Sequence, residues 1–156
     1  MLRIFPVETD EDIEAVKQLF VEYADSLGFN LGFQNFQEEL ANLPGDYTKP
    51  TGCLLVAKYK NQTVGCIGLR KLSDEICEMK RLYVRPEFRG FKIGRKLVEA
   101  IITEAKRIGY TCMRGDTVPS MTVARVLYAS FGFKEISPYR YNPIESAIFI
   151  ELKLND

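Results

Sequence analysis

Residues 82–95 combine glycine and basic side chains in a pattern that suits an anion. The segment reads LYVRPEFRGFKIGR and leads from an apolar strand pattern, through a glycine-bearing turn, into a helix pattern. The first turn of a helix offers unpaired N–H groups and the positive end of its dipole, and glycine lets the backbone approach a ligand closely. Arg89, Lys92 and Arg95 add formal charge at the same place. The segment therefore predicts a pyrophosphate site.

Other phosphate-binding motifs fit this segment less well. A P-loop requires GxxxxGK[ST], which the sequence lacks, and a dinucleotide fingerprint requires GxGxxG, which Gly90 and Gly94 do not satisfy. Asp116 lies where that fingerprint asks for an acid, but the strands before the loop are patterned as hairpins and not as a βαβ unit. An ordinary helix start with surface Arg and Lys residues stays open as the alternative at this point.

Proton transfer in this chain has few candidate groups, because the sequence contains no histidine. Ser-His-Asp and Cys-His mechanisms are thereby excluded, which leaves carboxylates, Tyr, Lys, Cys or water. The four cysteines are scattered singly in apolar runs, at Cys53, Cys66, Cys77 and Cys112. We interpret them as small core residues. We expect no metal site and a cytoplasmic protein.

The elements that must position these groups follow from hydrophobic periodicity. The 156 residues fit one domain, 1–156, with one core. The predicted helices are Thr9 or Asp10 to Gly28, 33–43, the 90–94 turn to Gly109, and a Ser120 cap to Gly132. The predicted strands are 2–7, 53–59, 63–72, 76–84, 111–117, 133–136 and 147–152. Short polar linkers make 53–84 an antiparallel meander, so we expect an α/β (α+β) fold with a mixed sheet covered by helices.

The strand, loop and helix at residues 78–94 resemble the acyl-CoA-binding motif of the GNAT N-acetyltransferases. That motif is usually written R-G-x-G-x-G, and Arg89, Gly90 and Gly94 match it. Lys92 stands in place of the middle glycine, where it removes one close backbone approach and can add a charge. A second motif, at residues 124–133, follows it in the same order as in the family.

A second resemblance covers residues 124–133, ARVLYASFGF, which look like the family's A-x-x-L-Y-x-x-x-G-F helix and strand. Met121 occupies the position where the family often has an asparagine, so one coenzyme contact is missing. The resemblance spans nearly the whole chain. It implies a mixed, mostly antiparallel sheet of about seven strands flanked by about four helices.

The resemblance also implies the cosubstrate and its site, because GNAT enzymes bind acetyl-CoA. In the family the strand before the motif splays from its neighbour, and the pantetheine arm bonds to the exposed backbone like an added strand. The expected coenzyme-binding residues are Leu82, Tyr83, Val84, Arg89, Gly90, Phe91, Lys92, Ile93, Gly94 and Arg95. The usual reaction is direct attack of an amine on the thioester in a ternary complex.

Two residues are predicted to be catalytic through the resemblance. Glu78 is the candidate general base, with pairing to a Lys or Arg across the sheet as the alternative and Asp116 as a second candidate base. Strand phase cannot decide, since a bulge would reverse the alternation. Tyr128 is the candidate general acid for the leaving thiolate, with a core aromatic role as the alternative.

Charge is unevenly spread, although the net charge is zero. Residues 8–46 hold ten acids and one base, while residues 80–96 hold seven bases and one acid. In the family the first two helices form a wall of the acceptor site, so the acids there, together with Phe29, Phe33 and Phe36, suit a cationic acceptor. We expect a small amine or a peptide amine, with the loop at 139–141 on the other side.

The sequence allows one alternative to N-acetyl transfer and argues against others. A catalytically silent acyl-CoA sensor or interaction module would keep the loop at 89–94 without needing Glu78 or Tyr128. A nucleic-acid partner is not expected, given the neutral charge and the lack of a recognition motif. No apolar run approaches a membrane span, so no membrane partner is expected. A homodimer is compatible with the resemblance.

Overall fold

The computed structural model describes residues 1–27, 35–144 and 146–155. The elements in chain order are β1 (Leu2–Pro6), α1 (Asp10–Ser26), α2 (Phe36–Ala41), the 3₁₀ turn η2 (Gly45–Tyr47), β2 (Cys53–Tyr59), β3 (Gln62–Lys71), β4 (Ile76–Val84), the 3₁₀ turn η3 (Pro86–Phe88), α3 (Ile93–Ile108), β5 (Cys112–Thr117), α4 (Thr122–Ser130), β6 (Lys134–Ile136) and β7 (Ile148–Lys153). The strands form one sheet in the order β1-β2-β3-β4-β5-β7-β6. All neighbours are antiparallel except β4 and β5, which are parallel. The predicted mixed, mostly antiparallel fold is confirmed.

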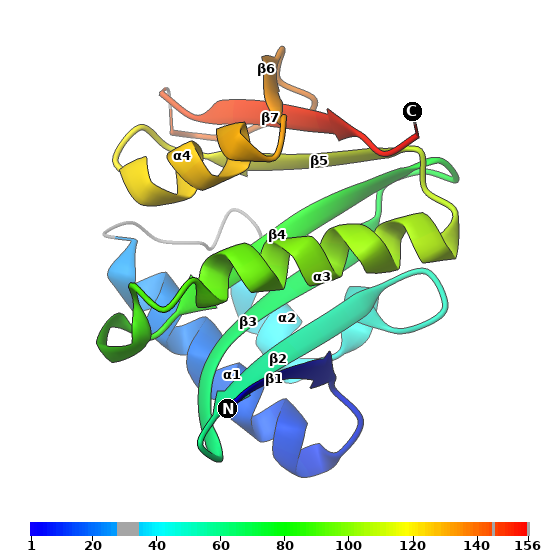
Figure 1. Ribbon diagram of the computed structural model, residues 1–156. Helices are drawn as coiled ribbons and strands as arrows, with labels where there is room; N and C mark the ends of the chain where they lie inside the picture. The colour runs from blue at the N-terminus through cyan, green and yellow to red at the C-terminus, as the bar shows by residue number, and fades with distance from the viewer. Residues whose placement is uncertain (28–34, 145, 156) are drawn as a thin grey trace.

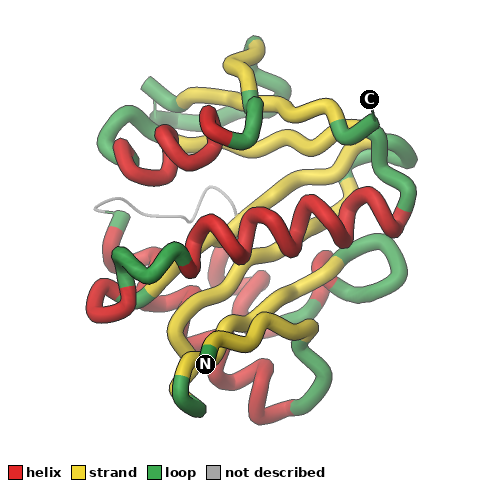
Figure 2. Tube along the Cα trace, in the orientation of Figure 1, coloured by secondary structure: helices red, strands yellow, loops and turns green. Residues whose placement is uncertain are grey.

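Helices cover both faces of the sheet, with α3 and α4 on one face and α1 and α2 on the other (Figures 1 and 2). Adjacent residues of β2 divide between the two cores. Leu55 packs with Leu97 of α3, and Leu54 packs with Leu19 of α1. Burial on both faces explains why β2 and β3 read as nearly continuous apolar runs instead of alternating ones.

The predicted end signals of the helices are confirmed in part. Thr9 caps α1 in a reciprocal capping box with Asp12, with a distance of 3.0 Å from the Asp12 backbone nitrogen to the Thr9 hydroxyl. Gly109 ends α3 with a φ of 113°, a conformation that glycine adopts without strain. The predicted stop at Gly28 lies outside the described residues, as does Phe33.

The predicted Ser120 cap of α4 is wrong. The backbone N–H of Met121 donates to the Val118 carbonyl at 3.0 Å, so Ser120 lies inside a turn, and Met121 occupies the N-cap position. None of the helices in the described ranges is long and apolar enough to span a bilayer.

Candidate active site

The central strands β4 and β5 are paired over only part of their length. Parallel pairing covers three residue pairs, from Ile76 with Cys112 to Glu78 with Arg114. β4 continues to Val84, and the two strands diverge beyond the last pair (Figure 1). Among the described residues, no strand pairs with this edge of β4 after Glu78. The predicted splaying is confirmed, and an open edge of this kind can bind an extended ligand as an added strand.

A bulge turns β4 within its opened segment. The register between β3 and β4 shifts between Cys66 and Gly68, and Arg81 on β4 has a left-handed backbone with a φ of 62°. A bulge re-aims the side chains that follow it. For this reason the alternation of residues along β4 could not predict from the sequence which side chains face the site.

The loop before α3 has the backbone shape that an anion site requires. Gly90 has a φ of 93°, and apart from Gly90 and its two chain neighbours no described atom lies within 4 Å of the place where a Cβ would stand. Lys92, at the N-cap of α3, is also left-handed with a φ of 62°. Lys92 thus adopts a left-handed conformation that glycine adopts more readily than lysine does. No described side chain caps α3, so the first-turn N–H groups keep their capacity for a ligand.

Two exposed arginines flank this loop and are held by neighbouring groups. The Arg89 Nε donates to the Val84 carbonyl at the end of β4, at 3.0 Å. The Arg95 Nη2 donates to the Ser130 hydroxyl of α4 at 2.8 Å, and its guanidinium lies 4.9 Å from the centre of the Phe131 ring. The loop, the opened strand and α4 therefore meet at one corner of the molecule.

The other residues predicted to contact the coenzyme differ in burial and in the elements that they pack against. Leu82 lines the pocket between β4 and β5. Tyr83 is buried on the α1 side, and Ile93 is buried in the α3 core, so their side chains belong to the two cores. Phe91 is exposed and lies against Tyr59, with ring centres 6.0 Å apart. For Tyr83 and Ile93, backbone groups are what could contact a ligand.

A pocket opens where β4 and β5 diverge. It is lined by Tyr23, Leu27, Met79, Lys80, Arg81, Leu82, Gly115, Asp116, Thr117, Val118, Met121, Tyr128, Asn142 and Ile150. Tyr128 is 8% exposed and packs on Phe133, with ring centres 5.8 Å apart. Tyr128 therefore has the core position that the sequence left open, and because it also lines the pocket, its role as general acid stays a prediction. Burial raises the pKa of its hydroxyl well above the usual value, so the hydroxyl keeps its proton at neutral pH.

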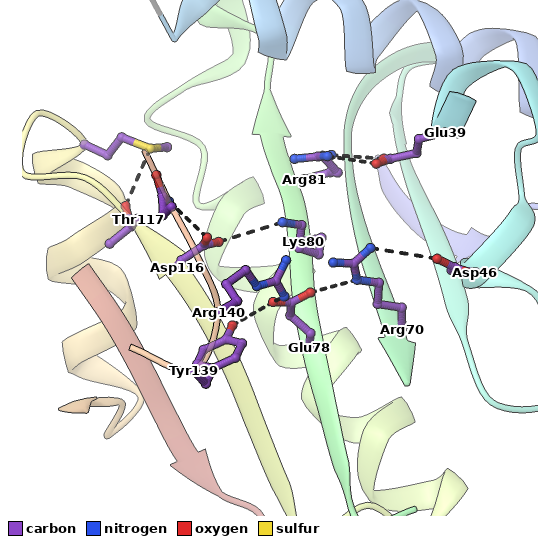
Figure 3. A network of polar contacts seen from close by, with 12 residues as sticks. Glu39, Asp46, Arg70, Glu78, Lys80, Arg81, Asp116, Thr117, Tyr139 and Arg140 are labelled. Carbon is purple, nitrogen blue, oxygen red and sulfur yellow. Dashed lines mark hydrogen bonds and ion pairs between the residues drawn. The ribbon is translucent and has the colours of Figure 1, made fainter. Parts of the chain in front are cut away.

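Lys80 and Asp116 form a buried pair on the pocket wall, across the opening between β4 and β5. The Lys80 Nζ lies 3.8 Å from the Asp116 Oδ1, and the two side chains are 3% and 9% exposed (Figure 3). Burial lowers the pKa of Lys80 to about 7, although the charge of Asp116 acts in the opposite direction. Lys80 belongs to the basic run of residues 80–96, but its side chain is buried and is not a surface charge.

Glu78 lies two residues before Lys80 on β4, and its fully buried carboxylate is shared among three donors. The Arg70 Nε donates to one oxygen at 2.7 Å, and the Tyr139 hydroxyl donates to the other at 2.6 Å. The Arg140 guanidinium forms an ion pair with the same second oxygen (Figure 3). Arg70 is the direct neighbour of Glu78 on β3, so pairing across the sheet, which the sequence analysis left open, is confirmed. The residues that line the pocket include Asp116 and do not include Glu78.

The acids of the first helices are less available than their number suggested. Glu39 of α2 accepts two hydrogen bonds from Arg81, at 2.8 and 3.0 Å, and Glu22 of α1 accepts two from Arg85 at the same distances. Burial is the largest influence on the pKa of Glu39 and would raise it, but the hydrogen bonds from Arg81 and Tyr47 and the charges of Arg81 and Lys80 together outweigh burial and lower it. Charge therefore no longer supports an acidic acceptor wall at these positions. Phe29, a further part of that predicted wall, lies outside the described residues.

Sequence reasoning missed Arg70, and it placed the loop at 139–141 beside the acceptor without predicting the contacts of Tyr139 and Arg140 with Glu78. Arg70 could have been found from the hairpin register, because strands joined by a short turn place it opposite Glu78. Arg140 comes from the loop between β6 and β7, 62 positions after Glu78. No local pattern predicts a contact across that separation.

Comparison with known proteins agrees with this geometry. The family model described as an acetyltransferase (GNAT) domain matches residues 50–135. An N-acetyltransferase of Schizosaccharomyces pombe is 40% identical over 99% of this chain and 96% of its own. A GNAT-family acetyltransferase structure from Staphylococcus aureus has a TM-score of 0.83 at 21% identity and covers 99% of this chain and 100% of its own. An N-acetyltransferase structure from Thermoplasma acidophilum, in complex with coenzyme A, has a TM-score of 0.76 at 19% identity, over 98% and 99% of the two chains.

Proposed function

This chain belongs to the GNAT acetyltransferase family and is an N-acetyltransferase; from that premise we propose that it moves the acetyl group of acetyl-CoA directly onto an amine in a ternary complex. The observation that carries the proposal is the opening between β4 and β5. β4 ends beside the loop before α3, where Arg89 donates to the Val84 carbonyl, and the pocket in the opening is lined by Tyr128, Lys80 and Asp116. One place thus offers an open strand edge, an anion site and groups that transfer protons.

The residues around the opening fit coenzyme A. The backbone of Leu82–Val84 can bind a pantetheine arm along the open edge. The uncapped start of α3, the space at Gly90 and the charges of Arg89 and Arg95 suit a diphosphate. Bound acetyl-CoA supplies the acetyl thioester that an amine attacks. Lys92 adds a third charge to this corner.

The Lys80–Asp116 pair supports removal of a proton from the amine. An alkyl ammonium with a pKa of about 10 costs about 4 kcal/mol to deprotonate at pH 7. A lysine whose pKa is near 7 is partly neutral at that pH, so the pair can accept the proton. We place the base here and not on Glu78, because Glu78 is fully buried and already accepts from two guanidiniums and a phenol.

Tyr128 supports the second proton transfer. Its hydroxyl keeps its proton at neutral pH because burial raises its pKa, and it lines the same pocket as Lys80. We therefore assign to Tyr128 the donation of a proton to the departing sulfur, as the family resemblance implied. A thiol with a pKa of about 8.5 needs only a modest proton donor.

The test is release of free coenzyme A thiol from acetyl-CoA in the presence of an amine panel, with acetylated products identified by mass spectrometry. The proposal predicts acceptor-dependent release that Tyr128→Phe suppresses while coenzyme affinity is kept. Coenzyme binding without release against any amine would instead support an acyl-CoA sensor.

A further inference from the structure

Two arginines share the buried carboxylate of Glu78, which directly precedes the pocket residues Met79 and Lys80 on β4. Arg70 and Arg140 both contact Glu78, and their side chains are 21% and 22% exposed. The only other carboxylate that the described part of the chain pairs with either is Asp46, 3.8 Å from Arg70, and its side chain is 80% exposed. Water and salt weaken so exposed a pair. Two guanidiniums thus have one well-buried anion between them.

Other buried or half-buried arginines nearby have partners of their own. Arg81 is paired with Glu39 through two hydrogen bonds, and Arg114 donates to Glu151 at 2.8 Å. The surplus of positive charge is therefore confined to Arg70 and Arg140. Burial, followed by the like charge of Arg70, lowers the pKa of Arg140 to about 10. An added anion would relieve this unfavourable setting.

The position of Arg140 relates this surplus to the chemistry. Its side chain lies between the Lys80–Asp116 pair and Glu78 in Figure 3. Glu78 and Lys80 are two residues apart on one strand, which corresponds to about 6.7 Å. An α-amino acid carries its amine and carboxylate on one carbon, and with one hydrogen bond of about 2.9 Å at each end it can bridge two groups that lie two residues apart on one strand. Its amine would meet Asp116, and its carboxylate would meet Arg140.

We propose that the acceptor is a free amino acid, whose carboxylate is bound by Arg140 and Arg70 while its amine faces Lys80 and Asp116. This inference rests on the proposed acetyl-transfer function and names its substrate class. The guanidinium fork suits a carboxylate, because its planar donors match two carboxylate oxygens. The transfer joins the amine nitrogen to the acetyl carbon, breaks the carbon–sulfur bond and moves one proton from nitrogen to sulfur.

The experiment compares matched acceptors at fixed acetyl-CoA. Each standard amino acid is assayed beside its own carboxamide, which keeps the amine and the side chain and removes only the negative charge. Loss of a hydrogen bond to a charged group corresponds to about tenfold or more, so the best amino acid should exceed its carboxamide in kcat/KM by at least that factor. Equal or better carboxamides would overturn the inference and leave the transferase function standing. Failure of every acceptor, with coenzyme binding kept, would overturn the transferase function and the inference with it.

Variants test the assigned side chain. Arg140→Gln should raise KM for the best amino acid about tenfold or more, bring the amino acid and its carboxamide close to equal, and leave KM for acetyl-CoA unchanged. Arg140→Lys keeps the positive charge but not the forked guanidinium, so its KM for the amino acid should lie between those of the unchanged protein and of Arg140→Gln. This variant also provides a test if Arg140→Gln folds poorly. Arg107→Gln, which removes a half-exposed charge on α3, is the matched control and should change neither constant.

Binding provides a readout that does not depend on turnover. The best amino acid is titrated calorimetrically into the protein saturated with coenzyme A. The inference predicts binding that Arg140→Gln weakens about tenfold or more and that the carboxamide does not show. Unchanged binding to the Arg140→Gln variant would contradict the assignment of the carboxylate to Arg140.

Discussion

The coenzyme corner and the acceptor face use positive charge in opposite ways. At the start of α3, Arg89, Lys92 and Arg95 are exposed and lie within seven residues of one another in the sequence. On the acceptor face, Lys80 and Arg81 are buried and paired with acids from distant elements. The coenzyme site proposed for the first region rests on local backbone shape and screened charge, whereas the second region depends on tertiary contacts.

This difference predicts in which region the fold should tolerate substitutions. Exposed charges contribute little to folding, because water and salt screen them. Buried charges that lose a partner are costly, since the remaining charge stays out of water. Substitutions in the coenzyme corner should therefore change binding with little effect on stability, and substitutions on the acceptor face should change both.

The largest effect is expected at Tyr128, where the two regions meet. Tyr128→Phe removes the proposed proton donor and keeps the aromatic packing on Phe133. We expect kcat to fall by about 10²–10⁴, with coenzyme affinity nearly unchanged. Steady-state kinetics and calorimetric titration of coenzyme A measure the two quantities. An unchanged kcat would remove Tyr128 from the mechanism.

The next largest effect is on stability, at Glu78. Glu78→Gln leaves Arg70 and Arg140 without their shared buried anion, and we expect unfolding to become easier by about 3–5 kcal/mol. Arg95→Gln is the matched change in the coenzyme corner, where an exposed group bonds Ser130. It should alter stability by about 0.5 kcal/mol or less and weaken coenzyme binding. Urea unfolding compares the two, and equal losses would contradict the contrast between the regions.

A smaller, pH-dependent effect is expected at Lys80. Its folded pKa of about 7 lies below its value in the unfolded chain, so between that pH and about 10.4 the unfolded state binds more protons. Stability then rises with pH across this window, by up to about 1.4 kcal/mol per pH unit. Lys80→Met should flatten that rise and remove the limb near pH 7 from the profile of kcat/KM. Unfolding at a series of pH values tests this, and parallel curves for the two proteins would refute it.

The smallest effect separates backbone strain from charge at the start of α3. Lys92 is left-handed with a φ of 62°, so Lys92→Gly should stabilise the fold by up to about 1 kcal/mol. Gly90→Ala, at a φ of 93° with open space around it, should have the opposite sign. Lys92→Gly should also weaken coenzyme binding modestly and reduce its salt dependence. A loss of stability in Lys92→Gly would contradict the strain argument.

The strand, loop and helix that form the proposed coenzyme corner could be predicted from the sequence, because their signals are local. Each of these elements is specified by residues close to it in the sequence, as for the strand Ile76–Val84, the glycine loop and the end of α3 at Gly109. The acceptor face could not be predicted, because Arg140 and Glu39 come from a loop and a helix far along the chain from Glu78 and Arg81. The bulge at Arg81 also reversed the alternation on which strand phase relies.

Amide hydrogen exchange with and without coenzyme A tests the central claim most directly. The open edge of β4 and the start of α3 are assigned to the coenzyme, so exchange should slow at Leu82–Val84 and at 90–95 when coenzyme A is added. Amides of the β2–β3 hairpin, which are already paired, serve as the internal reference and should not change. Unchanged exchange in both assigned segments, under conditions where the coenzyme is saturating, would contradict the account.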